Sequence, residues 1–257
     1  AYTTPYWLKE AANNGIYKVE DQQLRGLPET PTLTKSLFNL DFNGVMLSFE
    51  KPIVYKYNDP VLGETYQPFE IIPEVSLSFE DEMIIFENDE PKNISVKLTS
   101  GKANVKGEVS LSAGEGWIIE PKNHTFQLQQ KGSTTNLSFE VTPPKEQDES
   151  FIIPTATIDG RKFSEELISI DYPHIPKQNL VVPAKLKVAR LEIQKKGELI
   201  GYIEGAGDVV PESLEQIGYR VNKLNAATIS RSSLQKYDAI VLGIRALNTI
   251  EALKYKQ

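Results

Sequence analysis

Residues 75–79, with the sequence VSLSF, alternate apolar and polar side chains, and the pattern recurs along the following hundred residues. In a β-strand this alternation places one set of side chains against a core and the other set in water. The further runs are 94–98 (ISVKL), 109–111 (VSL), 126–128 (FQL), 137–141 (LSFEV), 152–153 (II) and 163–170 (FSEELISI). Turn residues such as Gly114-Glu115-Gly116 separate them. About seven short strands in about 100 residues predict an immunoglobulin-like β-sandwich over residues 74–172.

The region before the sandwich, residues 1–73, also carries strand-like runs. Residues 37–42 (LFNLDF) and 45–49 (VMLSF) flank Asn43-Gly44. An Asn-Gly pair between two such runs is a strong hairpin signal, because both turn residues tolerate positive φ. With a further strand expected at residues 52–57 (PIVYKY), the sequence predicts a β-rich N-terminal region.

Prolines space the stretch that follows the sandwich, residues 173–185. Proline breaks helices and restricts the residue before it, so we expect an extended linker here.

The pattern changes again over residues 186–257. A buried strand is expected at 199–203 (LIGYI), a helix beginning near Pro211 and ending at Gly218, and strands at 219–224 and 239–244. Asn248 and Glu251 have the spacing of a capping box that opens another helix. These elements predict the start of a parallel, flavodoxin-like α/β segment. Since a doubly wound sheet normally has more strands, the segment is expected to be truncated at Gln257.

Composition narrows the classes of function. The 257 residues suit about two domains, and a net charge of -7 without a basic cluster argues against nucleic acid or an anionic membrane surface as a partner. The chain has no cysteine, which excludes disulfides and thiolate chemistry. No apolar run approaches the ~20 residues of a membrane span. The first residue is Ala1 rather than methionine, which indicates a processed or internal start.

The loop Gly205-Ala206-Gly207-Asp208 lies between a predicted strand and a predicted helix, where backbone N–H groups attract anions. The third glycine of the dinucleotide fingerprint is missing. Three interpretations stay open: a tight turn, a nucleotide site, or a small-ligand site at the mouth of the sheet. The last predicts a pocket lined by Asp208 and Arg245.

No catalytic constellation is evident in the sequence. His124 and His174 are the only histidines, and neither has the spacing of a zinc site. There is no G-x-S-x-G elbow, and with 35 acidic residues a carboxylate pair carries no information by itself. We therefore expect no catalytic residue, metal ligand or cofactor.

Aromatic residues offer a different kind of site. Trp7, Tyr55 and Tyr57 in the N-terminal region are candidates for a surface that stacks on sugar rings, since aromatic faces bury apolar surface well. Core packing is the alternative for each, and Trp117, between Gly116 and two isoleucines, is expected in the sandwich core.

Two groups of motifs resemble a known family. They are PYWL at residues 5–8 with PIVYKY at 52–57 and GETYQP at 63–68, and YPHIP at 172–176 with IGYIEGAGD at 200–208 and DAIVLGIRA at 238–246. Together they resemble the C-terminal part of long Bacteroidetes proteins of the PIG-L/LmbE de-N-acetylase family. The resemblance implies sandwich modules followed by a class I glutamine-amidotransferase-like fold.

The family's zinc hydrolase domain carries a His-Pro-Asp-Asp type motif, and no His-Pro-Asp occurs here, so none of its catalytic residues can be transferred. The amidotransferase cysteine is missing as well. The resemblance thus implies a non-catalytic accessory region of a periplasmic or extracellular sugar de-N-acetylase, whose partners are the other domains of its parent protein. The alternatives are a carbohydrate-binding module and a small-ligand-binding or enzymatic α/β domain.

Overall fold

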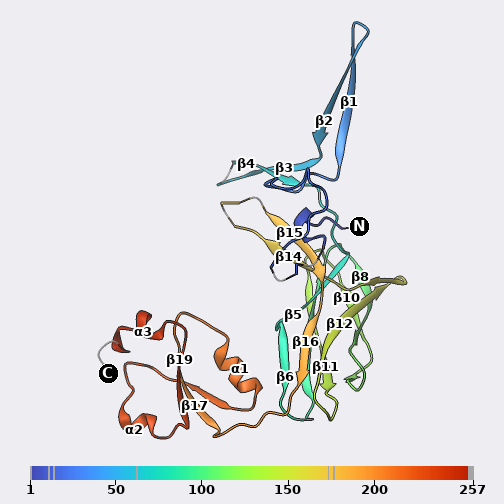
Figure 1. Cartoon of the computed structure of the whole chain (residues 1–257). Coiled ribbons are helices and arrows are strands. Elements are labelled where there is room, and N and C mark those ends of the chain that lie inside the picture. Colours follow the sequence, from blue (N-terminus) through green and yellow to red (C-terminus); the bar gives the residue numbers. More distant parts are fainter. Residues whose placement is uncertain are drawn as a thin grey trace.

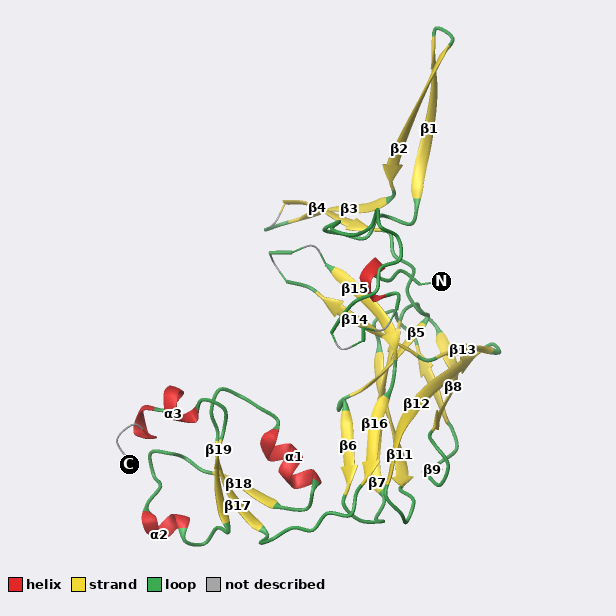
Figure 2. Ribbon diagram, viewed as in Figure 1, coloured by secondary structure: helices red, strands yellow, loops and turns green. Residues whose placement is uncertain are grey.

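The computed structural model describes residues 2–10, 12–13, 15–61, 63–172, 174–175 and 177–253. Within these ranges the chain is mainly β, with several separate sheets and three short α-helices (Figures 1 and 2). Figure 1 shows a long hairpin at one end, a layered β region in the middle and a small α/β segment beside its far end. This arrangement confirms a β-rich fold of several parts.

Two sheets make up the middle part. The first has the strand order β5-β7-β11-β9, with bounds Val75–Phe79, Lys92–Ser100, Thr134–Thr142 and Ile118–Glu120. The second has the order β10-β8-β12-β16-β6, with bounds His124–Leu128, Val105–Ser112, Asp148–Ile158, Leu186–Arg190 and Met83–Phe86, and β13 (Arg161–Phe163) pairs with β12.

Alternate side chains of the two sheets form one apolar core. Ile94, Val96 and Leu98 of β7 are fully buried, as are Phe139 and Val141 of β11. The polar residues between them face solvent, as the period of two requires. The runs 75–79, 94–98, 109–111, 126–128 and 137–141 therefore lie in strands whose inward side chains build this core, as do Ile152 and Phe163. The expected strand 163–170 is wrong in its extent, because residues 165–170 form β14 of a separate two-stranded sheet.

Trp117 lies in the same core. It is buried, its ring meets that of Phe86 edge to face at 5.3 Å, and its Nε1 donates a hydrogen bond to Asp148 Oδ2 at 2.6 Å. A buried indole N–H with a charged acceptor is a satisfied core group. Core packing, expected for Trp117, is confirmed.

Strand β16 is the main departure from the sequence-based division. Residues 186–190 were assigned to the third region, but β16 pairs antiparallel with β12 and parallel with β6 in the sandwich sheet. Leu186 and Val188 are completely buried in the core. The reason is that the strands with which β16 pairs are distant in the sequence. A domain boundary based on local composition takes no account of such pairing. Strands β6 and β9 were likewise not expected.

The linker is also more structured than expected. β14 (Glu165–Ile170) and β15 (Gln178–Pro183) form an antiparallel hairpin, so the second half of residues 173–185 is a paired strand. The hairpin is fastened to the sandwich, since the Leu167 N–H donates to Ser76 Oγ at 2.8 Å. Pro173 and Pro176, which suggested the linker, lie outside the described residues.

The N-terminal region contains a 3-10 turn, η1 (Tyr6–Leu8), and two hairpins. β1 (Lys35–Phe42) and β2 (Val45–Pro52) pair around Asn43 and Gly44, whose φ values of 53° and 84° confirm the predicted turn. β3 (Val54–Asp59) pairs with β4 (Gly63–Pro68). Contrary to the usual consequence of alternation, every residue of β2 is exposed, because no second layer covers the β1–β2 hairpin among the described residues.

The third part is a parallel sheet in the order β18-β17-β19, with bounds Arg220–Lys223, Leu199–Ile203 and Ala239–Leu242. Helix α1 (Val210–Gln216) has Pro211 in its first turn and Gly218, with φ 88°, just beyond its end, as predicted. A second helix, α2 (Arg231–Leu234), was not expected. Within the described residues, no helix is long and apolar enough to cross a membrane.

The predicted capping box at Asn248 is wrong. Helix α3 (Ala246–Thr249) begins after Arg245, which caps it in the left-handed region, so Asn248 lies inside the helix. A capping box occurs instead at the start of α2. The Ser230 side chain, at the N-cap, accepts from the Ser233 N–H at 3.2 Å, and the Ser233 side chain accepts from the Ser230 N–H at 2.8 Å.

One prediction tests the placement of β16. Leu186→Ala should lower the free energy of unfolding by about 2–5 kcal/mol, because it leaves a cavity in the sandwich core. Urea unfolding followed by Trp117 fluorescence, in a Trp7→Phe background, measures the loss. Leu37→Ala, in the exposed hairpin, is the matched control and should stay within about 0.5 kcal/mol. An equal loss of unfolding free energy in the two variants would contradict the placement of β16 in the core.

Candidate functional site

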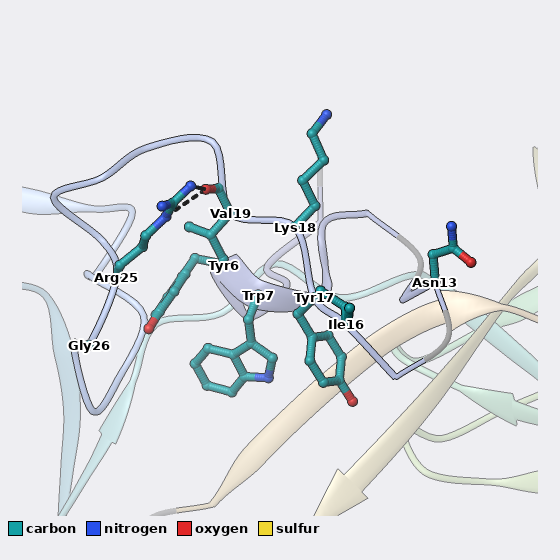
Figure 3. A pocket seen from close by; sticks show the side chains of 9 residues that line it. All are labelled: Tyr6, Trp7, Asn13, Ile16, Tyr17, Lys18, Val19, Arg25 and Gly26. Carbon is teal, nitrogen blue, oxygen red and sulfur yellow. Dashed lines mark hydrogen bonds between the residues drawn. The ribbon is translucent and has the colours of Figure 1, made fainter.

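An open cleft of about 710 Å³ lies beside the 3-10 turn η1 in the N-terminal region (Figure 3). Its walls combine aromatic, aliphatic and polar side chains. They come from Tyr6, Trp7, Asn13, Ile16, Tyr17, Lys18, Val19, Arg25 and Gly26. We call this set the aromatic cleft.

Tyr6 anchors one wall of the aromatic cleft. It is buried, its hydroxyl donates to the Leu27 carbonyl at 3.0 Å, and its N–H donates to Thr30 Oγ1 at 3.1 Å. Its ring meets that of Trp7 edge to face at 4.9 Å. The next residue, Trp7, therefore packs against a tyrosine that is held in place by two hydrogen bonds, and it is itself only partly buried.

A tight turn supplies the other wall. The N–H of Asn13 donates a hydrogen bond to the Ile16 carbonyl, and the Ile16 N–H donates one to the Asn13 carbonyl. Gly15, which lies between them, has a φ of 77°. This turn delivers Tyr17, which is 53% exposed, to the cleft. In Figure 3 the rings of Trp7 and Tyr17 project to the same side of the 3-10 turn, whereas Lys18 points the other way.

The charged groups at the rim are already engaged. Lys18 Nζ lies 3.1 Å from Glu20 and 3.4 Å from Glu10, and hydrogen bonding to these two carboxylates, Glu20 first, raises the pKa of the lysine. Arg25 donates from Nε and Nη2 to the Val19 carbonyl, at 3.0 and 2.6 Å. Both cations that line the cleft therefore already have partners within the N-terminal region.

The other predicted aromatic residues do not share this cleft. Tyr55 and Tyr57 of β3 stack on each other, with ring centroids 5.6 Å apart. Tyr55 lines a different cavity of about 850 Å³, between the β3–β4 hairpin and the sandwich, where Lys97 and Lys177 are among the walls. Tyr17 belongs to the aromatic residues of the N-terminal region but was not singled out as a candidate, and it lines the cleft together with Trp7. The signal that could have found it is Gly15, two residues before it, because glycine favours a turn.

The predicted loop residues of the α/β segment do come together. Parallel strands β17 and β19 bring Gly205 and Asp208, at their carboxyl ends, beside Ile244 and Ala246, the two neighbours of Arg245 in the chain. A Cβ on Gly205 would lie 2.2 Å from the Ile244 carbonyl oxygen, so only glycine fits there. Gly207 has φ 89°, which also favours glycine.

Asp208 holds this loop to the next one. Its Oδ1 accepts hydrogen bonds from the Tyr202 hydroxyl and from the Val210 N–H at 3.1 Å, and its Oδ2 accepts from the Ile244 N–H at 3.0 Å. The bond from Tyr202 is the largest of the causes that lower the pKa of Asp208. Burial, followed by the hydrogen bond to Asp208, raises the pKa of Tyr202 to about 12. The carboxylate therefore fastens the two loops to each other.

Arg245 is exposed and starts helix α3, with φ 57° and its carbonyl accepting from the Thr249 N–H at 2.9 Å. It lines neither of the two cavities described above, and nor does Asp208.

Metal-binding groups are absent from the described part of the chain, where no three His, Cys, Asp or Glu residues cluster. His124 contacts the Ser138 carbonyl at 2.8 Å and packs edge-on against Phe139. His174 stacks on Tyr172 at 5.9 Å. Both imidazoles thus make packing contacts.

No protein-family model matches the chain, and no curated protein matches it in sequence. Among solved structures it is similar to a C. elegans MSP family member, with 8% identity over 47% of this chain and 98% of that one, at a TM-score of 0.25. A family 123 glycoside hydrolase from Clostridium perfringens aligns with 8% identity over 51% of this chain and 30% of that one, at a TM-score of 0.28. The sporulation control protein Spo0M from Bacillus subtilis aligns with 14% identity over 46% and 50%, at 0.26. Likenesses this low do not bear on function.

The role of Asp208 can be tested by pH. Because its pKa is lowered in the folded state, its ionised form stabilises the fold above the unfolded pKa of about 3.9, and this contribution is lost as pH falls through the folded pKa. Asp208→Asn should therefore reduce hydrogen-exchange protection of β17 and β19 at pH 7, and the difference from the natural chain should shrink below about pH 4.

The control for this prediction is Glu215→Gln, which changes an exposed acid on α1. It should leave protection of the sheet unchanged at both pH values. A pH-independent difference for Asp208→Asn would show that the charge of the carboxylate does not matter.

Proposed function

We propose that this chain is a non-catalytic accessory region of a larger carbohydrate-active protein, and that it binds neutral glycan in the aromatic cleft. The observation that carries the proposal is the pair of rings, Trp7 and Tyr17, on one side of an open cleft.

The chemistry of the cleft suits a sugar. The C–H face of a pyranose is apolar and packs on an aromatic face, while its rim of hydroxyl groups needs polar partners. Asn13 and the Tyr17 hydroxyl offer hydrogen bonds beside the rings. Lys18 is paired with two carboxylates, and Arg25 donates two hydrogen bonds to the Val19 carbonyl, so both cations that line the cleft already have partners.

The wider setting proposed is that of the PIG-L/LmbE de-N-acetylase family, in which this chain corresponds to the region after the zinc hydrolase domain. Two features support it. The facing sheets of the middle part suit an immunoglobulin-like module. The strand order β18-β17-β19, with all three strands parallel, is the order in which flavodoxin-like and amidotransferase-like sheets begin.

The α/β segment has a structural role in this proposal rather than a catalytic one. Two of its carboxylates, Asp208 and Asp238, are each bonded by donors of their own segment. The segment is also attached to the sandwich, since the Ile85 N–H donates to Gln216 Oε1 at 3.1 Å and Lys92 Nζ donates to the Gln216 carbonyl at 3.3 Å. These contacts suit a part that orients neighbouring domains.

Titration calorimetry with soluble oligosaccharides, including N-acetylglucosamine oligomers, tests the binding site. We expect a dissociation constant of roughly 0.1–1 mM, and a loss of at least about tenfold for Trp7→Ala and for Tyr17→Ala. Tyr66→Ala is the matched control for Tyr17, because Tyr66 is similarly exposed, at 56%, but lies outside the cleft.

Two results would contradict this assignment. Absence of binding by the natural chain at millimolar sugar would refute the glycan proposal. Loss of binding in Tyr55→Ala but not in Trp7→Ala would move the site to the second cavity.

The non-catalytic role has its own test. The purified chain, incubated with N-acetylglucosamine oligomers and divalent zinc, should release no acetate above the buffer control. Release that rises in proportion to chain concentration would make the chain an enzyme.

A further inference from the structure

The β1–β2 hairpin has two chemically different faces. Its register pairs Phe38 with Phe49, Leu40 with Leu47 and Phe42 with Val45. Because side chains alternate across a strand, these three directly opposite pairs share one face. We call these six residues the apolar face.

The opposite face is polar for most of its length. Lys35 Nζ pairs with Glu50 at 2.8 Å, Ser48 Oγ donates to Asn39 Oδ1 at 2.7 Å, and Asp41 Oδ1 accepts from the Gly44 N–H at 2.7 Å. The hairpin is therefore amphipathic, like a strand pair whose one side belongs against another layer.

No layer of the described chain covers the apolar face. Its six side chains are between 43% and 70% exposed, and Figure 1 shows the hairpin projecting away from the rest of the molecule. An isolated two-stranded hairpin is marginal in water, and an apolar patch of several hundred Å² marks an interaction surface. A partner that buries this face would stabilise the hairpin.

We propose that this partner is a second copy of the chain, whose apolar face packs against the first around a two-fold axis. The strip is nearly symmetric about its central Leu40–Leu47 pair, with a pair containing phenylalanine on either side. In a face-to-face pairing that runs antiparallel, the central pairs meet at the axis. The Phe38–Phe49 pair of one copy then meets the Phe42–Val45 pair of the other. Such an interface is self-complementary, as a two-fold dimer requires.

The available area fits a weak dimer. Three phenylalanines of about 150–250 Å² each, half to two-thirds exposed, with two leucines and a valine, offer roughly 500 Å² per copy. Two copies would bury roughly 1,000 Å², which is the lower limit of a specific interface. We therefore expect a dissociation constant of about 1–100 μM.

Charge favours a second copy over a membrane. The Asp41 carboxylate lies next to the tip, where insertion into lipid would have to desolvate it. A face-to-face dimer leaves the Asp41 side of both hairpins in water.

Sedimentation equilibrium of the full chain tests the proposal, with a matched pair of variants on one strand. Leu40→Lys places a charge in the apolar face and should raise the dimer dissociation constant more than tenfold. Leu37→Lys makes the same change on the opposite face, at a similarly exposed leucine (59% against 53%), and should change it less than twofold.

A second measurement locates the axis. The chain has no cysteine, so Leu40→Cys and Leu37→Cys each introduce a single thiol. A short bismaleimide should link two copies through Leu40→Cys and should not link them through Leu37→Cys.

The proposal is overturned by a chain that stays monomeric up to about 300 μM, well above the expected dissociation constant. It is equally overturned by a dimer that Leu40→Lys does not weaken, or by a monomer that sediments with phosphatidylcholine vesicles. None of these outcomes affects the glycan proposal, which depends on Trp7 and Tyr17.

Discussion

Alternate side chains of two facing sheets exclude water from each other, and the order of the rest of the molecule depends on this packing. The core side chains of β7, β11 and β12 are each largely or wholly buried, and they hold the two sheets together. The loops, hairpins and α/β segment are attached to these sheets. Glu74 is an example of a residue that forms ion pairs at the edge of the first sheet. Its carboxylate meets Lys102 Nζ at 2.5 Å and Arg161 Nη2 at 2.6 Å, just before β5 begins. The hydrogen bond from Lys102 heads the causes that lower the pKa of Glu74.

Local patterns in the sequence were sufficient where a strand alternates or a turn has a fixed chemistry. They identified β5, β7, β10 and β11, and the Asn43–Gly44 turn. They were insufficient where the partner is distant. β6 has the sequence MIIF, with no alternation, and β16 pairs with it across about a hundred residues. Exposure of the β1–β2 hairpin could not be predicted either, because alternation indicates a face to be buried but not what buries it.

The same distinction applies to the candidate sites. Gly205, Asp208 and Arg245 could be placed together from the sequence, because the carboxyl ends of neighbouring parallel strands meet at one edge of a sheet. The role of Asp208 could not be predicted from the sequence, because the positions of its three hydrogen-bond donors depend on the detailed path of two loops. Trp7 and Tyr55 were grouped by composition alone. The structure separates them into two cavities, because the turn at Asn13 and Gly15 brings Tyr17, rather than Tyr55, to Trp7.

The parallel pairing of β6 with β16 has a consequence for synthesis of the chain on the ribosome. β5, β7, β11 and β9 can assemble once residue 142 has emerged, but the second sheet has no place for β6 until residues 186–190 leave the exit tunnel. Until then Met83–Phe86 stays an unpaired edge beside a half-covered apolar layer. Translation of the intervening hundred residues takes about 5–20 s, during which this edge is open to pairing with other chains.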